Sequence, residues 1–227
     1  MNAVSRTLPV SSTPRSGVLP DLPGELKSTD HWALFRLTRD RATGRFKKFP
    51  LSGFKSNDAS TWKSFEQIAP QLGSLVRPAF ALSADRLSGP GLIVIDVDHC
   101  VTDGQLSPAA ARILQMFAGT YIERSVSGDG FHIFLRGTTP MRPKEKIIVD
   151  GTELDIEVYS SRRFIVMTGE LAEGGAPVIL DLQPQLDLLA SMRPGFTPVL
   201  TAPVVHTAQP VITAPAAPTA AEDVSEP

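Results

Sequence analysis

The sequence contains a single cysteine, Cys100, among its 227 residues. One thiol cannot close an intrachain disulfide, and it cannot supply the cysteine cluster of a structural zinc site. No apolar run approaches the ~18 residues that a membrane-spanning helix requires, so no membrane partner is expected. The formal net charge is only −2, which argues against an overall basic field for nucleic acid but leaves room for a local basic groove.

What is present is enough apolar material for a core. Hydrophobic residues make up 42% of the chain and charged residues 20%, proportions typical of a globular protein. Residues 1–18 contain two prolines and a glycine, which oppose an amphipathic targeting helix and predict a disordered tail. Residues 193–227 are rich in Pro, Ala and Thr and predict a disordered linker or tail. The folded domain is therefore predicted to span residues 19–192 and to lie in the cytoplasm.

Strands dominate the predicted domain. Short apolar or alternating segments bounded by turn residues predict strands at 31–37, 44–50, 78–83, 91–98, 120–126, 131–137, 153–160 and 162–169. The turn sequence SGDG joins the strands 120–126 and 131–137 into a predicted hairpin. The last two strands predict a second hairpin in the same way. We expect an α/β (α+β) fold with a mixed, largely antiparallel sheet and flanking helices.

Three segments show helical spacing. Residues 107–120 give the clearest helix, with Ser107 as N-cap, Pro108 at the first helical position and a glycine at the end. Residues 60–72 predict a second helix that starts from Ser60 or Thr61. Residues 181–192 predict a short closing helix. These helices would flank the sheet and help to bury it.

Polar side chains interrupt the apolar pattern of three strands. Asp96 and Asp98 end the strand "IVIDVD", and strand alternation places both on one face. His132 lies on one face of the strand 131–137, and Asp155 shares a face with Glu157 on a later strand. Carboxylates that converge repel one another unless a cation lies between them, and oxygen ligands suit Mg²⁺ or Mn²⁺. Taken singly, however, each of these features is also common in turns, caps and solvent-facing strands.

Other kinds of site were compared with the same residues. A calcium-binding EF-hand loop requires Asp or Asn and then a glycine where Cys100 and Val101 stand. Zinc is disfavoured because His99 and Cys100, as neighbours on a strand, cannot easily reach one ion. A haloacid-dehalogenase-type phosphatase also has a strand ending in Asp-x-Asp, with Asp96 as nucleophile. Its motif continues with Gly-Thr, where this chain has His99-Cys100, so the match is partial.

The compound pattern resembles the catalytic domain of phage and plasmid primase-polymerases, in the archaeo-eukaryotic primase superfamily. That family has a strand ending in Asp-x-Asp, a small-residue–x–His segment and an acidic residue on a later strand. Asp96 and Asp98 fit the first motif, His132 the second and Glu157 the third. In the phage branch the wider patterns also match, and in this chain they are filled by Tyr121, Glu123, Ser125, Ser127, Gly128, Gly130 and His132, and by Glu157, Tyr159, Arg163, Phe164, Thr168 and Gly169. The resemblance covers residues 32–170.

The resemblance implies a site and a reaction. Asp96, Asp98 and Glu157 would hold Mg²⁺ or Mn²⁺, with Asp155 as the alternative to Glu157, and His132 would contact the phosphates of the nucleotide. Further nucleotide-binding candidates are Lys47, Lys48, Ser127, Arg162 and Arg163. Strand alternation puts Lys47 and Lys48 on opposite faces, so only one of them is expected to reach the site.

The implied function is that of a DNA primase and DNA polymerase, a nucleotidyltransferase that acts on a single-stranded DNA template in phage or plasmid replication. Its substrates would be nucleoside triphosphates, and its setting the cytoplasm of a bacterial host cell. The chain has no Gly-x-x-x-x-Gly-Lys-[Ser/Thr] phosphate loop, so a separately encoded replicative helicase is a candidate partner. The alternatives are the phosphatase and a non-catalytic replication-initiation module that binds DNA or nucleotide.

Overall fold

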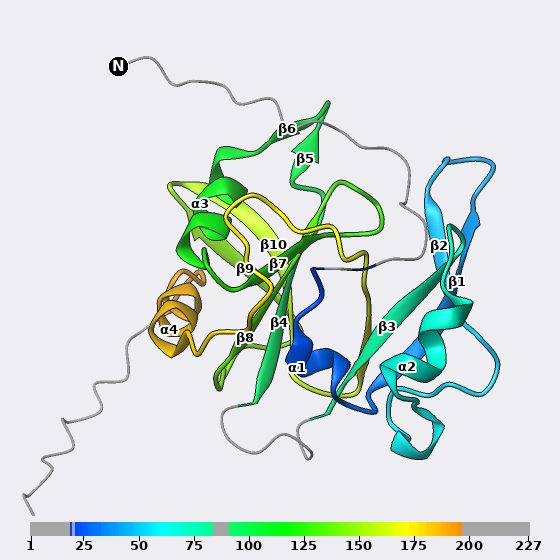
Figure 1. The fold of residues 1–227 in the computed structure, drawn as a ribbon. Coiled ribbons are helices and arrows are strands. Elements are labelled where there is room, and N and C mark those ends of the chain that lie inside the picture. The colour runs from blue at the N-terminus through cyan, green and yellow to red at the C-terminus, as the bar shows by residue number, and fades with distance from the viewer. Residues whose placement is uncertain (1–18, 20, 84–90, 197–227) are drawn as a thin grey trace, which may run out of the picture. The chain divides into compact units, whose positions relative to one another are not determined.

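The computed structural model describes residues 19, 21–83 and 91–196 (Figure 1). Of the predicted tails, 1–18 and 193–227, residues 1–18 and 197–227 lie outside the described residues. The described strands form two main sheets and a small ribbon, and every pair of named strands is antiparallel. The predicted fold class, an α/β protein with largely antiparallel sheet, is confirmed, although the expectation of a single sheet was wrong.

The four-stranded sheet has the order β11-β3-β1-β2. Its strands are β1 (Trp32–Arg39), β2 (Phe46–Pro50), β3 (Val76–Leu82) and β11 (Arg163–Val166). The five-stranded sheet has the order β7-β8-β4-β10-β9. Its strands are β4 (Leu92–Val97), β7 (Tyr121–Arg124), β8 (Phe131–Arg136), β9 (Lys144–Val149) and β10 (Thr152–Tyr159), and the ribbon pairs β5 (Val101–Thr102) with β6 (Gln105–Leu106).

The described helices are short. The α-helices are α1 (Gly24–Lys27), α2 (Phe65–Ile68), α3 (Pro108–Met116) and α4 (Gln183–Ser191), with 3₁₀ turns at Ala59–Thr61 and Ala69–Gln71. Among the described residues, no helix is both long and apolar enough to cross a membrane. The predicted cap of α3 is confirmed, because the Ser107 hydroxyl accepts a hydrogen bond from the Ala110 amide and Pro108 follows it.

The start of the helix predicted at 60–72 was wrong. Ser64, rather than Ser60 or Thr61, caps α2, and it exchanges reciprocal hydrogen bonds with Gln67. This capping box satisfies two backbone donors at once, which favours a start at this point. Only residues 65–68 are α-helical, and the chain then tightens into a 3₁₀ turn that contains Pro70.

The second predicted hairpin was also wrong. β10 pairs with β4 and β9, whereas β11 pairs with β3 in the other sheet. The true hairpin partner of β10 is β9, a strand that the sequence interpretation missed. Asp150 and Gly151, both at positive φ, form the turn between them, and such an Asp-Gly pair is a strong hairpin signal. The chain therefore passes from one sheet to the other between Tyr159 and Arg163.

The central strand of the five-stranded sheet, β4, is buried on both faces. On one face Ile93, Ile95 and Val97 belong to a core that includes residues of α3 and α4, and these helices flank that sheet in Figure 1. On the other face Val94 joins a core that includes Trp32 of the four-stranded sheet. Alternation along β4 puts Asp96 on the same face as Val94, so this carboxylate points away from α3 and α4.

Candidate active site

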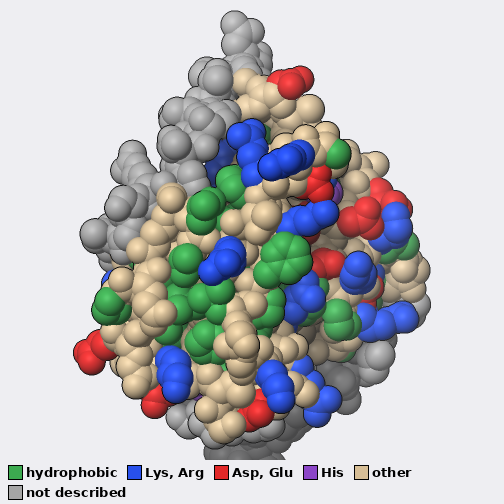
Figure 2. Space-filling view, turned by 90° about the vertical axis from the view of Figure 1, so that its right-hand side faces the viewer, with side chains coloured by type: hydrophobic (Ala, Val, Ile, Leu, Met, Phe, Trp, Pro, Cys, Tyr) green, Lys and Arg blue, Asp and Glu red, His purple; other side chains and the backbone are tan. Residues whose placement is uncertain are grey.

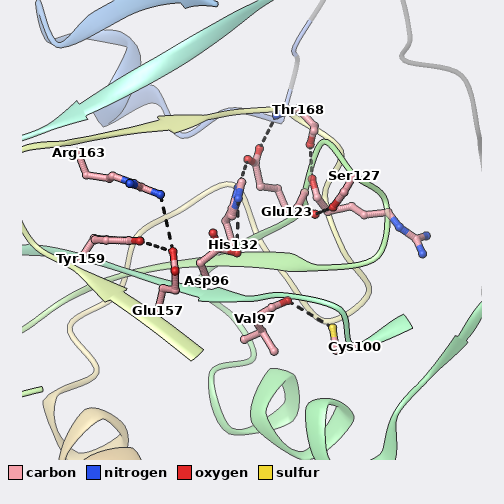
Figure 3. Close-up of polar contacts among 12 residues, drawn as sticks. Asp96, Val97, Cys100, Glu123, Ser127, His132, Glu157, Tyr159, Arg163 and Thr168 are labelled. Atoms are coloured by element: carbon pink, nitrogen blue, oxygen red, sulfur yellow. Dashed lines mark hydrogen bonds and ion pairs between the residues drawn. The ribbon is translucent and has the colours of Figure 1, made fainter. Parts of the chain in front are cut away.

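One register row of the five-stranded sheet carries five ionisable side chains, and it ends at Lys144 on β9, which lies opposite Glu157. Asp96 on β4 lies directly opposite Glu157 on β10 and opposite His132 on β8. His132 in turn lies opposite Glu123 on β7. Directly opposite residues of antiparallel strands project from the same face with their Cβ atoms ~5 Å apart. The pairing therefore brings together side chains that are far apart in the sequence (Figure 3).

Three carboxylates converge at this row. One oxygen from each of Asp96, Asp98 and Glu157 lies within 4.8 Å of the others. Asp96 is only 9% exposed, and its Oδ1 has no hydrogen-bond partner among the described residues. Burial raises the pKa of the Asp96 carboxyl, and although His132 lowers it, the charges of Asp98 and Glu157 raise it further. A buried oxygen left without a partner beside two more carboxylates fits a divalent cation with oxygen ligands.

The Glu157 carboxylate is surrounded by donors. The Tyr159 hydroxyl donates a hydrogen bond to its Oε2. Lys144 Nζ lies 3.3 Å from Oε1, and Arg163 Nη2 lies 3.7 Å from Oε2. The Arg163 guanidinium also lies 4.6 Å from the centre of the Tyr159 ring. Burial and the bond to Glu157 raise the pKa of Tyr159, so its phenol stays protonated and remains a donor.

His132 is buried between two acids. Its Nδ1 lies 2.9 Å from Glu123 Oε1, and its Nε2 lies 3.8 Å from Asp96 Oδ1. The ring is 2% exposed. Burial lowers the pKa of His132, but the hydrogen bond to Glu123 and the charges of Asp96 and Glu123 outweigh it and raise the pKa overall. The Nε2 atom is the one that faces the carboxylate group.

The turn between β7 and β8 contacts the segment that follows β4. The backbone amides of Cys100 and Val101 donate to the Asp129 carbonyl, at 2.8 and 3.1 Å. The Asp129 carboxylate pairs with His99 Nδ1 at 3.0 Å. Ser127 Oγ lies 2.8 Å from Ser125 Oγ, so its hydroxyl takes part in the structure of the turn. These contacts place the turn beside Asp98.

Cys100 does not belong to the chemistry of this site. Its side chain is buried, and the thiol donates to the Val97 carbonyl at 3.4 Å. Burial raises the pKa of the Cys100 thiol to about 12, so it stays protonated at neutral pH. A thiol that stays protonated is a poor nucleophile, and Cys100 is not part of the group of described side chains that could hold a metal ion.

Gly130 is required by the close approach of this turn to β4. A Cβ at this position would lie 2.7 Å from the Val97 carbonyl oxygen and 3.2 Å from Asp98 Cα. We therefore expect Gly130→Ala to push Asp98 out of place and to lower the free energy of unfolding by about 1–3 kcal/mol. Chemical denaturation measures this, with Gly73→Ala as control, because a Cβ on Gly73 meets nothing within 4 Å. Equal stability of the two variants would contradict the contact.

The predicted nucleotide-binding residues differ in their surroundings. Lys47 pairs with Asp40 at 2.6 Å, whereas the charge of Lys48 is close enough to lower the pKa of both Asp96 and His132. Arg163 reaches Glu157, as described above. For Arg162 the contacts are made by the backbone: it has φ 54°, and its amide donates to the Leu82 carbonyl.

No role was predicted for three neighbours of the site. Glu123 and Tyr159 were part of the matched patterns but were given no chemistry, and Lys144 belongs to the missed strand β9. The signal for Glu123 was an acid two residues after Tyr121 on a strand that is otherwise buried. Asp155, the alternative ligand, lies opposite Lys146 with its side chain 84% exposed and is not part of the carboxylate cluster.

Comparison with known proteins found a similarity to a phage protein over part of the chain. No known family model matches the sequence. Over 147 residues, which cover 63% of this chain, the sequence is 30% identical to a DNA primase-polymerase of Nitratiruptor phage NrS-1. The match covers 20% of that phage protein, so the chain spans about a fifth of the length of the curated relative.

Proposed function

Because the chain carries a primase-polymerase-like domain, we propose that it is a divalent-metal-dependent nucleotidyltransferase. It would act as a DNA primase and polymerase, joining nucleoside triphosphates on a single-stranded DNA template during phage or plasmid replication in a bacterial host cell. A separately encoded replicative helicase would be its partner. The observation that carries this proposal is the convergence of Asp96, Asp98 and Glu157 within 4.8 Å of one another.

These three carboxylates are the proposed ligands for Mg²⁺ or Mn²⁺. When bound, such ions neutralise the charge of the triphosphate and make the attacking hydroxyl a better nucleophile. The protein's own part is to hold the ligands in place. β4 and β10 are adjacent and antiparallel, so two ligands come from a rigid sheet, and Asp98 follows directly after β4. The three ligands thus need little reorganisation on binding.

Three cationic groups at the edge of the cluster are the proposed contacts to the phosphates. His132 presents Nε2 next to Asp96. Arg163 lies beside Glu157, with its side chain 52% exposed, and its planar guanidinium suits a bidentate contact to phosphate. Lys48 lies on β2 of the other sheet and acts on Asp96 and His132. The nucleotide would therefore bind between groups contributed by both sheets.

The β1–β2 hairpin is the proposed surface for the template. Residues 36–50 include six Lys or Arg and one Asp, a local charge of 6 − 1 = +5, and all six basic residues are exposed. Phe49, 51% exposed, lies opposite Arg36 and offers a ring on which a base could stack. Figure 2 views this side of the molecule and shows Lys and Arg side chains around exposed hydrophobic ones. The hairpin is therefore locally basic, although the formal net charge of the whole chain is −2.

Lys48 and Lys47 form a matched pair for testing this arrangement. Lys48 lies opposite Leu37 and Lys47 opposite Thr38, so the two side chains project from opposite faces of β2. We expect Lys48→Ala to lower the rate of synthesis about 10-fold, the equivalent of one lost charge-assisted contact. Lys47→Ala should change the rate less than about twofold, because the charge of Lys47 is already paired with Asp40 and is not among the unpaired charges that the hairpin offers to the template. Steady-state synthesis assays decide this, and equal losses would argue against a specific role for Lys48.

The proposed function is tested by a synthesis assay. The protein is given single-stranded DNA, deoxynucleotides or ribonucleotides, Mg²⁺ or Mn²⁺, and either a primer or none. Extended or newly primed products are expected, and their loss on chelation. A haloacid-dehalogenase-like phosphatase would instead release phosphate from small esters. A non-catalytic replication-initiation module would bind DNA or nucleotide, for example in fluorescence anisotropy, without any incorporation. Either of these results would overturn the proposal.

A further inference from the structure

The proposed reaction leaves Glu123 without a role, although it is an acid with 0% exposure. A buried carboxylate is costly unless its oxygens are satisfied by hydrogen bonds. Its Oε2 accepts from the Tyr121 hydroxyl at 2.8 Å, from the Thr168 amide at 3.1 Å and from the Gly169 amide at 2.9 Å. Its Oε1 is 2.9 Å from His132 Nδ1. Both oxygens of Glu123 therefore have hydrogen-bond partners, and His132 is the partner at Oε1.

The donors at Oε2 indicate which partner donates the hydrogen bond at Oε1. A backbone amide can only donate, so the two amides of residues 168 and 169 require Oε2 to accept. The Tyr121 hydroxyl donates to the same oxygen. A carboxylate accepts hydrogen bonds at both of its oxygens, so we assign the hydrogen of the Glu123–His132 bond to Nδ1 of the imidazole.

Packing and hydrogen bonds of the segment after β11 hold the two backbone amides that bind Glu123 in place. The residues at 168 and 169 follow β11 of the four-stranded sheet. Gly169 has φ 67°, and a Cβ on it would lie 2.6 Å from Leu19 Cδ2. The Thr168 hydroxyl donates to the Arg124 carbonyl at 2.6 Å, which ties this segment to β7. Thr168 and Gly169, which end the matched sequence pattern, therefore have a structural role: their two amides bind the carboxylate of Glu123.

Fixing Nδ1 leaves Nε2 as the nitrogen that faces the reaction. Its distance of 3.8 Å to Asp96 Oδ1 is too long for a hydrogen bond. Figure 3 shows the ring of His132 between Glu123 on one side and Asp96 on the other. We propose that Glu123 is the positioning residue for His132: it binds Nδ1 and so presents Nε2 to the phosphates of the nucleotide at the carboxylate cluster. This inference rests on the proposed function, since it assigns His132 to the nucleotide.

Glu123→Gln tests the geometry without any assay of activity. The glutamine carbonyl would face the three donors at Oε2, which turns its NH₂ group toward His132 and requires Nδ1 to accept. Two-bond ¹H–¹⁵N NMR correlations report which ring nitrogen carries hydrogen, and His132→Gln identifies the signal among the four histidines. We expect Nδ1 to carry hydrogen in the wild-type protein and to lose it in Glu123→Gln. The inference would be overturned if Nδ1 kept its hydrogen in the variant. It would also be overturned if Nδ1 carried no hydrogen in the wild-type protein. If the variant does not fold, the wild-type spectrum alone decides.

Kinetics then test whether Glu123 acts through His132. Loss of a residue that orients a site group commonly costs about 10- to 100-fold in activity, and we expect this loss in kcat/KM for the nucleotide with template affinity unchanged. Glu153→Gln is the matched control, because Glu153 is exposed and pairs with Lys146. In the His132→Gln background, Glu123→Gln should add no further loss. A full additional loss would show a merely structural role and overturn the inference.

The two proposals fail in different ways. A wild-type protein that makes no product overturns the proposed function, while the NMR comparison still decides whether Glu123 sets the hydrogen of His132. An active wild-type protein whose Glu123→Gln variant is equally active overturns only the inference about Glu123.

Discussion

Asp96→Asn is expected to abolish template-directed synthesis, with a loss of at least about 10³-fold. The substitution keeps the shape of the side chain but removes the charge of a proposed metal ligand. The metal's contribution to stabilising charge in the transition state is worth several kcal/mol, and each ~1.4 kcal/mol corresponds to a tenfold change in rate. Asp96 is the most buried of the three proposed ligands and lies between Glu157 and His132 in the register row. The measurement is product formation on single-stranded DNA with saturating Mn²⁺ or Mg²⁺.

Asp155→Asn provides the matched control for this experiment. Asp155 is on the same strand as Glu157 and is also acidic, but its side chain is 84% exposed and pairs with Lys146. Its neutralisation should leave synthesis within about twofold of wild type, as expected for a surface ion pair. If Asp96→Asn folds and remains active, or if both variants lose activity equally, the assignment of Asp96 as a metal ligand fails.

Divalent ions are expected to stabilise the wild-type protein and to lose this effect in Asp96→Asn. A ligand at about 100 times its Kd adds about 2.7 kcal/mol to the free energy of unfolding. For a domain of this size that corresponds to a rise in Tm of about 5–11 °C. Thermal unfolding with Mg²⁺, Mn²⁺ or a chelator measures the shift. Asp155→Asn should keep the shift, and an equal shift in Asp96→Asn would place the ion elsewhere.

In the absence of metal ions, Asp96→Asn is expected to stabilise the protein. Burial and the charges of Asp98 and Glu157 raise the folded-state pKa of Asp96, so its ionised form costs free energy in the folded protein at neutral pH. Asp96→Asn removes that cost, and we expect its metal-free Tm to exceed that of wild type. The advantage should shrink as the pH falls through the raised pKa toward the ordinary value, because the wild-type carboxyl then binds a proton too. A pH-independent difference would mean that the electrostatic cost is not its cause.

Prediction from the sequence succeeded where the signal was local. Strand alternation put Asp96 and Val94 on one face, and the structure shows both on the side away from α3 and α4. The SGDG turn predicted the β7–β8 hairpin, and Ser107-Pro108 predicted the start of α3. These features depend on residues within a few positions of one another, so the sequence carries them directly.

Prediction failed where the outcome depended on distant partners. β10 and β11 are near neighbours in the chain and were expected to form a hairpin, yet each finds its partner in a different sheet. Glu123 was part of a matched pattern, but its role required Thr168 and Gly169, which come from the segment after β11. No periodicity within a strand reveals which other strand will lie beside it.

The sequence by itself determined that this protein has a strand ending in paired aspartates, a turn followed by His132 and a later strand with Glu157, because side-chain alternation and turn chemistry are local properties. Only the tertiary structure decided that β8, β4 and β10 are neighbours in one register, so that these residues meet. It also decided that Lys47 pairs with Asp40, whereas Lys48 lies opposite the buried Leu37, and that Glu123 forms a hydrogen bond with His132. The reason is physical: strand order and register are set by the burial of two separate cores and by backbone pairing between distant segments.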